Sequence, residues 1–298
     1  MLRGTTSMTG ESIVDVYYGD PAEFAFCKGS GWTEPVRNQA DVERRAAHCV
    51  LNHLLARQAG IEPKTIRYFY GFNGKPELDP EATKRRIHFN LSHTSRRFSI
   101  AISNSIEVGV DVECIRDSRD HASIAEYAFS RSEIEALRST PSSQQPQMFT
   151  AIWVRKEAII KAVGGSAALL LDTFSVSVET KRSGSGAHTG GPQRNSMDEP
   201  QARRVSPPEG LTVRPSLTSG VATPVRIPLG DLPENRPDDP AHDRLRFSHS
   251  QDLPAGPLYR TAVAFVAPPE DVRVRYFRVR PSDILGSHRA GFQRTGFS

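Results

Sequence analysis

The sequence is poor in cysteine and has no long run of apolar residues. Its three cysteines, Cys27, Cys49 and Cys114, are widely spaced and form no Cys-x-x-Cys pair. This pattern predicts reduced thiols rather than a disulfide framework or a zinc site. No apolar run approaches the roughly 20 residues that cross a membrane, and residues 1–12 lack the apolar segment of a secretory signal. We therefore predict a cytoplasmic protein without a membrane partner.

Neither sign of charge dominates the chain. The 38 lysine and arginine residues and the 34 aspartate and glutamate residues are interspersed and leave a net charge of +4. So mild an excess argues against bulk binding of nucleic acid, but it suits an anionic small ligand or an acidic partner. A chain of 298 residues is long enough for one or two domains with a sizeable core.

Residues 181–254 lack the hydrophobic periodicity of the rest of the chain. Twelve of the 22 prolines fall within residues 181–260, among many Gly, Ser, Arg and Asp residues. Such a composition buries too little apolar surface to offset the entropy lost on ordering the chain, so we predict a disordered insertion. The alternative interpretation is a partner-binding segment in polyproline II conformation.

The stretch Phe149–Gly165 predicts a helix that ends at a pair of glycines. At about 100° per residue its apolar residues gather on one broad side, namely Phe149, Ile152, Trp153, Ile159, Ile160 and Val163. Lys156 projects into that side, and Glu157 and Lys161 lie one turn apart at its edge. One interpretation is a core helix with a snorkelling lysine and a surface ion pair. The other is a buried lysine whose cost is offset by an anion or a metal ion.

The stretch Ile106–Ile115 predicts a strand with two different faces. Its aliphatic residues alternate with Glu107, Gly109, Asp111 and Glu113. Gly109 leaves the second face bare, so a ligand or another element can approach closely there. The carboxylates of Asp111 and Glu113 lie about 6.6 Å apart along the strand and can converge on one small cation such as Mg²⁺. In the alternative interpretation they form the solvent face of an edge strand.

The other elements follow from apolar periodicity and turn residues. Strands are expected at Ile13–Tyr18, on both sides of a turn within Ile87–Ile102, and at Leu169–Glu179, Leu258–Val266 and Val272–Val279. The alternation of Phe98, Ile100 and Ile102 with Arg97, Ser99 and Ala101 predicts that the strand after the turn is half-buried. Helices are expected at Asp41–Gly60, capped by Asp41, and after Ser130, where Glu133 completes a capping box.

Several polar residues in these elements have both an ordinary and a functional interpretation. Arg44 and Arg45, in the first turns of a helix, are either solvated surface charge or phosphate contacts. Lys75, in a turn-rich hairpin, is either a loop residue or a ligand contact. His93 taken alone is structural or exposed. Because Ser92 stands in no Gly-x-Ser-x-Gly sequence, a hydrolase triad is a poor fit.

Three motifs follow one another along the chain. They are N-L-S-H-T at residues 90–94, G-V-D-V-E at residues 109–113 and W-x-x-K-E-x-x-x-K-A-x-G at residues 153–164. This series resembles the 4'-phosphopantetheinyl transferase superfamily, specifically its larger, surfactin-synthetase-activating type. The resemblance extends over residues 40–180, and the strand at 258–266 also matches.

The resemblance implies an α+β fold of two similar α/β-sandwich-like halves in a pseudo-twofold arrangement, with coenzyme A held between them. A faint similarity between residues 97–103 and 259–266 suits two such halves. We expect the N-terminal half, on the adenine and phosphate side of coenzyme A, at residues 1–105. The C-terminal half, with the magnesium ion and the catalytic helix, is expected at residues 106–180 plus 255–285. The Pro-rich insertion at residues 181–254 is long for the family.

The resemblance also implies roles for individual residues. The metal-binding acids are Asp111, Glu113 and Glu157. The catalytic residues are Glu157, Lys161 and Lys156. The contacts to coenzyme A are Arg44, Arg45, Lys75, Pro76, Ser92, His93, Lys156 and Lys161. Trp153 matches the aromatic residue that anchors the catalytic helix.

The implied activity is magnesium-dependent transfer of 4'-phosphopantetheine from coenzyme A to a serine of an apo acyl or peptidyl carrier protein. The reaction releases 3',5'-ADP and asks the protein mainly for positioning and charge neutralisation. Glu157 is the expected base, acting directly or through water. The alternative is a non-catalytic scaffold that binds coenzyme A. We expect a monomer that acts on carrier proteins of polyketide, peptide or fatty-acid synthesis and that binds no nucleic acid.

Overall fold

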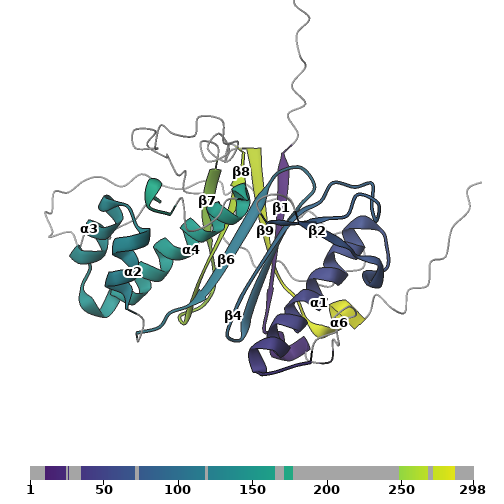
Figure 1. Ribbon diagram of the computed structural model, residues 1–298, viewed down its shortest axis with the longest axis horizontal. Coiled ribbons are helices and arrows are strands. Elements are labelled where there is room, and N and C mark those ends of the chain that lie inside the picture. The colour runs from purple at the N-terminus through teal and green to yellow at the C-terminus, as the bar shows by residue number, and fades with distance from the viewer. Residues whose placement is uncertain are drawn as a thin grey trace, which may run out of the picture.

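The computed structural model describes residues 11–24, 26, 35–70, 74–117, 120–164, 171–176, 248–267 and 271–285. As expected, these residues form a mixed α+β fold, in which two main sheets pack together and each carries one long helix (Figure 1). In the described part of the chain, no helix combines the length and the apolar character that a membrane span requires.

The first sheet has the strand order β4-β5-β1-β9. Its strands are β1 (Ser12–Gly19), β4 (His88–Thr94), β5 (Arg97–Ser103) and β9 (Val272–Arg278). Neighbours are antiparallel except β1 and β9, which run parallel. Helix α1 (Gln39–Ala59) buries its apolar side against this sheet, and its side chains share one core with Phe98, Ile100 and Ile102.

The second sheet has the strand order β6-β8-β7 and is antiparallel throughout. Its strands are β6 (Val108–Cys114), β7 (Ser248–Leu253) and β8 (Tyr259–Val266). Helix α4 (Gln145–Val163) packs across it and shares a second core with Ala262 and Ala264. A third core lies between the sheets, where Val14 and Ala101 meet Val110 and Phe265. The layers are therefore α1, first sheet, second sheet and α4.

The two halves repeat one path of the chain. In the first half a strand, a long helix and a hairpin (β1, α1, β4 and β5) give the order β4-β5-β1. In the second half β6, α4, β7 and β8 give the order β7-β8-β6. Strand β9 then returns to the first sheet beside β1, so it lies outside the second half in which residues 255–285 were expected.

Shorter elements fill the connections. Beside the first sheet lie the 3₁₀ helices η1 (Pro21–Phe24) and η2 (Pro63–Thr65), the hairpin β2 (Tyr68–Tyr70) and β3 (Pro76–Leu78), and the short helix α6 (Pro281–Leu285). Beside the second lie α2 (His121–Ala128), α3 (Arg131–Ser139), η3 (Ser142–Gln144) and η5 (Leu171–Thr173).

The helix ends are largely those that the sequence predicts. Gly60 and Gly164 end α1 and α4 in the left-handed region, with φ of 74° and 75°. Ser130 and Glu133 form the expected capping box at the start of α3. The prediction that Asp41 caps α1 is wrong. Asn38 is the cap, because its side chain accepts a hydrogen bond from the backbone N–H of Asp41 at 3.0 Å.

Other predictions also need correction. Strand β5 is buried on both faces, since α1 covers one and the second sheet covers the other. Residues 171–176 form a 3₁₀ turn and an irregular segment rather than part of a strand at Leu169–Glu179. Cys49 is disulfide-bonded and Cys114 is free, so the expectation of reduced thiols fails at Cys49. The predicted insertion at 181–254 lies outside the described residues up to 247, and its end is wrong, because Ser248–Leu253 form β7.

Candidate active site between the two sheets

Strand β6 lies at the edge of its sheet, and side chains of β4 from the other sheet bind its backbone. The side-chain oxygen of Asn90 accepts a hydrogen bond from the N–H of Val110 at 2.9 Å. The hydroxyl oxygen of Ser92 accepts one from the N–H of Val112 at 3.3 Å. An edge strand otherwise presents unpaired backbone groups. The N-L-S-H-T motif therefore fixes β6 against the first half, and Asp111 stands between the two bound amides.

Asp111 is the buried centre of the site, with 3% of its surface exposed. Its Oδ1 accepts hydrogen bonds from the Ser92 hydroxyl at 2.8 Å and from Nζ of Lys161 at 2.6 Å. Its Oδ2 is buried without a hydrogen-bond partner among the described residues. A buried carboxylate oxygen without a partner is costly and calls for a ligand that supplies positive charge. Such burial rules out the interpretation of Asp111 as part of a solvent face.

Helix α4 supplies two further charged groups, Glu157 and Lys161. It approaches β6 so closely that a Cβ atom on Gly109 would lie 2.1 Å from the carbonyl oxygen of Ala158. The bare face predicted at Gly109 thus receives a helix. Burial raises the pKa of Glu157, Lys161 lowers it, and the negative charges of Asp111 and Glu113 raise it further, so the net shift is upward.

The pKa of Lys161 moves in the opposite sense from that of a buried isolated lysine. Burial acts to lower it, but the charge and hydrogen bond of Asp111 and the charges of Glu157 and Glu113 outweigh burial and raise it. The side chain of Lys161 remains 30% exposed, whereas that of Asp111 is 5% exposed. Lys161 is therefore a firmly charged group that reaches both the buried carboxylate and the open space above it.

The acids of the site fit a divalent cation. Asp111 and Glu113 raise the pKa of Glu157 through their charge, which indicates that the carboxylates lie close enough to repel one another. A cation would relieve this repulsion and would complete the unpartnered Oδ2 of Asp111. Within the described ranges, no three acidic, histidine or cysteine side chains already stand in a metal-binding group. The carboxylates of Asp111, Glu113 and Glu157 are of the right chemical type for a divalent cation. In this structure they surround the ammonium group of Lys161.

Lys156 is not part of this cluster. Its side chain is fully buried among α4, α3 and the segment around Phe174, and its Nζ lies 2.7 Å from Oε2 of Glu133 on α3. The expected contact of Lys156 with phosphate does not fit this position, because helix geometry turns it away from the face that carries Glu157 and Lys161. Trp153 is partly buried and stacks on Phe149 with 5.9 Å between ring centroids, as an anchor residue would.

A group of basic residues from the first half of α1 and from β4 lies near Lys161. His93 lies near the end of β4. Partial desolvation of its ring, together with the charges of Arg44 and Lys161, lowers its pKa, although Glu43 opposes this. Burial, His93 and Arg44 lower the pKa of His48 to about 4. The imidazoles are therefore neutral at pH 7 in an electropositive region. Sequence reasoning missed His48, although its spacing of four residues from Arg44 places both on one helix face.

The two arginines predicted as phosphate contacts differ in position. Arg44 is exposed and donates to Oδ1 of Asp41 at 2.8 Å, one turn earlier on α1. Arg45 is partly buried. The structure thus brings Arg44 within electrostatic reach of His93 and His48.

Lys75 connects the β2–β3 hairpin to β6 and α4. Its Nζ donates to Oε2 of Glu107 at 2.8 Å and to the carbonyl oxygens of Val108 and Ala162 at 3.2 and 2.9 Å. It thereby ties the β2–β3 hairpin to the last turn of α4, where a cation suits the helix dipole. Burial raises the pKa of Glu107, but its bonds to His88 and Lys75 prevail and lower it to about 2.

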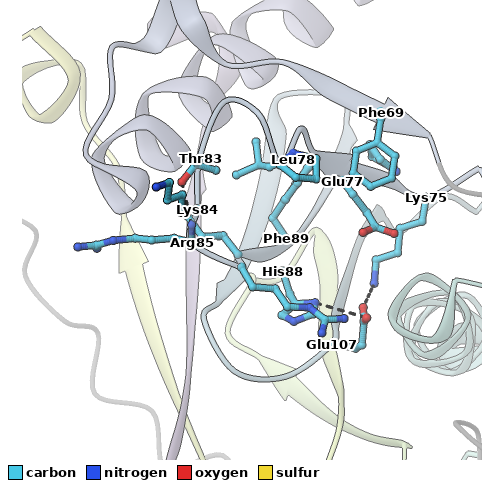
Figure 2. Close-up of a pocket in the computed structure, with 14 residues that line it drawn as sticks. Phe69, Lys75, Glu77, Leu78, Thr83, Lys84, Arg85, His88, Phe89 and Glu107 are labelled. Atoms are coloured by element: carbon cyan, nitrogen blue, oxygen red, sulfur yellow. Dashed lines mark hydrogen bonds and ion pairs between the residues drawn. The ribbon is translucent and has the colours of Figure 1, made fainter.

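A cavity of about 280 Å³ lies beside this link, with Phe69, Lys84 and Arg85 among its lining residues. Figure 2 shows Lys75 and His88 converging on Glu107 at one end of it. Pro76 begins β3 and also lines the cavity. Sequence reasoning missed the contact between Glu107 and His88, because it joins residues from distant elements.

The geometry therefore defines a class of protein: an α+β fold whose interface between two sheets carries clustered acids beside a charged lysine. Residues 107–203 match the model of the 4'-phosphopantetheinyl transferase superfamily. This stretch contains β6, the acids and α4. The predicted resemblance to that superfamily is confirmed.

Individual relatives cover the same part of the molecule. The chain is 34% identical over 125 residues to the 4'-phosphopantetheinyl transferase HetI of a Nostoc species, which is 42% of this chain and 53% of the relative. It is 37% identical over 122 residues to AcpT of Escherichia coli K12, covering 41% and 57% of the two chains. It is 32% identical over 129 residues to Sfp of Bacillus subtilis 168, covering 43% and 54%. The chain thus spans little more than half the length of these relatives.

Proposed function

We propose that the protein transfers the 4'-phosphopantetheine group of coenzyme A to a serine of an apo acyl or peptidyl carrier protein and releases 3',5'-ADP. The observation that carries this proposal is the buried carboxylate of Asp111, whose Oδ1 is bound by Lys161 and whose Oδ2 has no partner among the described residues. The relatives that bear the name 4'-phosphopantetheinyl transferase support the same activity.

In this reaction the serine oxygen forms a bond to the phosphorus that carries the pantetheine arm. The bond from that phosphorus to the bridging oxygen breaks, and this oxygen leaves with 3',5'-ADP. Glu157 takes the serine proton, directly or through water. Lys161 neutralises negative charge on the pyrophosphate oxygens.

Asp111, Glu113 and Glu157 would hold a magnesium ion. When bound, the ion would supply charge neutralisation at the pyrophosphate. Because Lys161 occupies Oδ1 of Asp111, the metal would use Oδ2 and the other two acids. Ser92 then orients Asp111 through its hydrogen bond of 2.8 Å instead of contacting the nucleotide.

The basic group on α1 and β4 is our candidate for the nucleotide end of coenzyme A. Arg44, His93 and His48 lie close enough to influence one another electrostatically, and Lys161 connects them to the acids. A phosphate placed there would favour the protonated imidazoles. Arg45 and Pro76 remain candidates for the edge of the same site. Lys75 serves it by holding the hairpin to α4.

The proposal also includes the organisation of the whole protein. Each half has one sheet, one long helix and the same strand order, which supports a pseudo-twofold relationship between them. We take the acids and α4 to belong to the C-terminal half and the basic group to the N-terminal half. We further infer a cytoplasmic monomer that acts in polyketide, peptide or fatty-acid synthesis.

A transfer assay tests the proposal. The protein is incubated with coenzyme A, Mg²⁺ and an apo carrier protein, and the intact mass of the carrier and the release of 3',5'-ADP are followed. The expected result is a mass gain of one phosphopantetheine on the carrier serine, with an equal amount of 3',5'-ADP. Binding of coenzyme A without transfer would identify a scaffold. Release of 3',5'-ADP without a carrier would identify a hydrolase.

A further inference from the structure

The ion pair between Lys156 and Glu133 has no part in the proposed chemistry. It is nevertheless buried completely, which is a costly place for two charges. The side chain of Lys156 is 0% exposed and that of Glu133 is 1% exposed, with 2.7 Å between Nζ and Oε2. Most of its surroundings are apolar, and Nζ lies 4.4 Å from the ring centroid of Phe174. Ion pairs of this kind stabilise a fold no more than well-packed apolar residues do, and often less. Their hydrogen bonds, however, are directional.

The pair joins three segments of the second half. Oε2 of Glu133 also accepts the N–H of Ser130 at 2.8 Å, at the start of α3. Its Oε1 accepts the N–H of Val176 at 2.6 Å. Nζ of Lys156 donates to the carbonyl oxygen of Phe174. Both carboxylate oxygens and the ammonium group are therefore bonded, and α4 is tied to α3 and to the segment around residue 174.

Helix α4 is fixed on its other sides by different contacts. The bare face of β6 at Gly109 meets the backbone around Ala158, and Lys75 binds the carbonyl oxygen of Ala162 near the helix end. Lys156 supplies the anchor on the side toward α3 and the segment around residue 174. Glu157 and Lys161 follow it by one and five residues, so a rotation of α4 about its axis would move both side chains relative to Asp111.

We propose that the Lys156–Glu133 pair is a positioning device that sets the rotation of α4 and thereby holds Glu157 and Lys161 against Asp111. The kinetic part of this inference rests on the proposed function. The structural part does not, because the rotation and rigidity of α4 can be measured without substrate. Apolar packing alone would keep the helix in the core but would not fix its angle so firmly.

Two variants with the charges removed test the proposal. The first combines Lys156→Met with Glu133→Leu, which keeps the apolar volume. The second combines Lys156→Met with Glu133→Gln, whose side-chain oxygen can still accept the N–H of Val176. The matched control is Ile152→Val, on the same helix and fully buried in the same core. Thermal midpoints and hydrogen exchange of the α4 amides are measured on the metal-free protein, followed by transfer kinetics with Mg²⁺.

In the charge-removed variants, we expect amides near residues 155–161 to exchange at least about tenfold faster, because fixed hydrogen bonds limit local opening. We expect kcat to fall about 10- to 100-fold, as a misplacement of about 1 Å costs, with KM for coenzyme A within about threefold. The Ile152→Val control should lower the thermal midpoint and leave kcat unchanged.

The proposal is overturned if a folded charge-removed variant keeps both the exchange rates and the kcat of the wild type. It is also overturned if the Ile152→Val control loses as much kcat as the charge-removed variants, or if neither charge-removed variant folds, since the pair would then serve folding alone. If the wild type shows no transfer, the proposed function fails, and the exchange rates alone decide whether the pair positions α4.

Discussion

Helices α1 and α4 occupy the same place in the two halves of the molecule, but only α4 carries a charge into its core. The buried residues of α1 are all apolar, alanine or cysteine, whereas those of α4 include Lys156. Arg44 and His48, the groups of α1 that enter the candidate site, lie within electrostatic reach of His93 on β4. A repeated scaffold thus presents cations from one helix and both acid and cation from the other. The candidate chemistry is concentrated where the second half differs from the first.

Removing an acid from the α4 side should have the largest effect. We expect Asp111→Asn or Glu157→Gln to lower kcat about 10²- to 10³-fold, as loss of one preorganised electrostatic group does. The affinity for 3',5'-ADP should change much less, because the lost interaction acts mainly on the transition state. Steady-state transfer kinetics and calorimetric binding measure the two quantities. The control is Glu126→Gln on the exposed side of α2, and equal activity of either site variant would remove that residue from the site.

Two glycines compare a tightly packed position with an open one. Gly109 lies where α4 packs closely on β6, and Gly60 ends α1 with no atom near its missing side chain. Gly109→Ala would place a Cβ 2.1 Å from the backbone of α4, so we expect a loss of about 3 kcal/mol of unfolding free energy or more. Gly60→Ala meets no atom within 4 Å and suffers only from its φ of 74°, which predicts a loss of about 1 kcal/mol. Denaturant unfolding measures both. A smaller loss at position 109 than at position 60 would contradict the tight packing of α4 on β6.

The basic group on the α1 side predicts a pH effect on binding. His48 and His93 have lowered pKa values in the free protein, and phosphate would favour their protonated forms. Binding of 3',5'-ADP should therefore take up protons and tighten by about tenfold between pH 7 and pH 5. His48→Gln should reduce the dependence, whereas His53→Gln on the same helix should leave it intact. Calorimetry in buffers of different ionisation enthalpy measures the uptake, and a pH-independent affinity would place the phosphate elsewhere.

The lowered pKa of His48 also predicts a stability effect in the free protein. The folded state binds this proton only near pH 4, whereas the unfolded state binds it near pH 6.5. The unfolded state therefore binds more protons between these values, and stability falls as the pH drops from about 6.5 to about 4. Thermal midpoints across this range should fall less steeply in His48→Gln than in the wild type. Parallel curves would contradict the burial of a neutral imidazole at this position.

The smallest effect is expected at an exposed ion pair. Arg131 and Glu135 on α3 are 94% and 65% exposed, with 3.2 Å between Nε and Oε1. Arg131→Ala should change the unfolding free energy by less than about 0.5 kcal/mol, because solvent and salt screen such pairs. Glu133 stands two residues away from Arg131 in a fully buried pair, so the two positions contrast exposed and buried charge on one helix. A loss at Arg131 comparable with that at Glu133 would contradict the contrast.

Local signals in the sequence predicted the elements well because they depend on near neighbours. The glycines after α1 and α4 and the capping box at Ser130 act within one turn, and the structure confirms them. The alternation in β5 predicted a strand correctly but the wrong exposure. Burial there depends on a helix and a second sheet from distant parts of the chain. The pairing of β9 with β1 in the first sheet was also missed, because it too joins distant parts of the chain.

The two lysines of α4 show the limit of motif reasoning. Lys156 and Lys161 stand in one motif, and their spacing alone does not say which faces the core. Lys156 is buried because Glu133, 23 positions earlier in the chain, supplies a matching charge in a core that sequence periodicity cannot display. Lys161 faces Asp111 because Gly109 lets α4 approach β6. Contacts between distant elements therefore decide which lysine is buried in the core and which one faces the site.

The central claim is that Asp111 and its partners on α4 form the site of group transfer. The most direct test is the intact mass of an apo carrier protein after incubation with coenzyme A, Mg²⁺ and either the wild type or Asp111→Asn. Both proteins should bind 3',5'-ADP with similar affinity, and the wild type alone should add one phosphopantetheine to the carrier at an appreciable rate. Transfer by Asp111→Asn at the rate of the wild type would contradict the account.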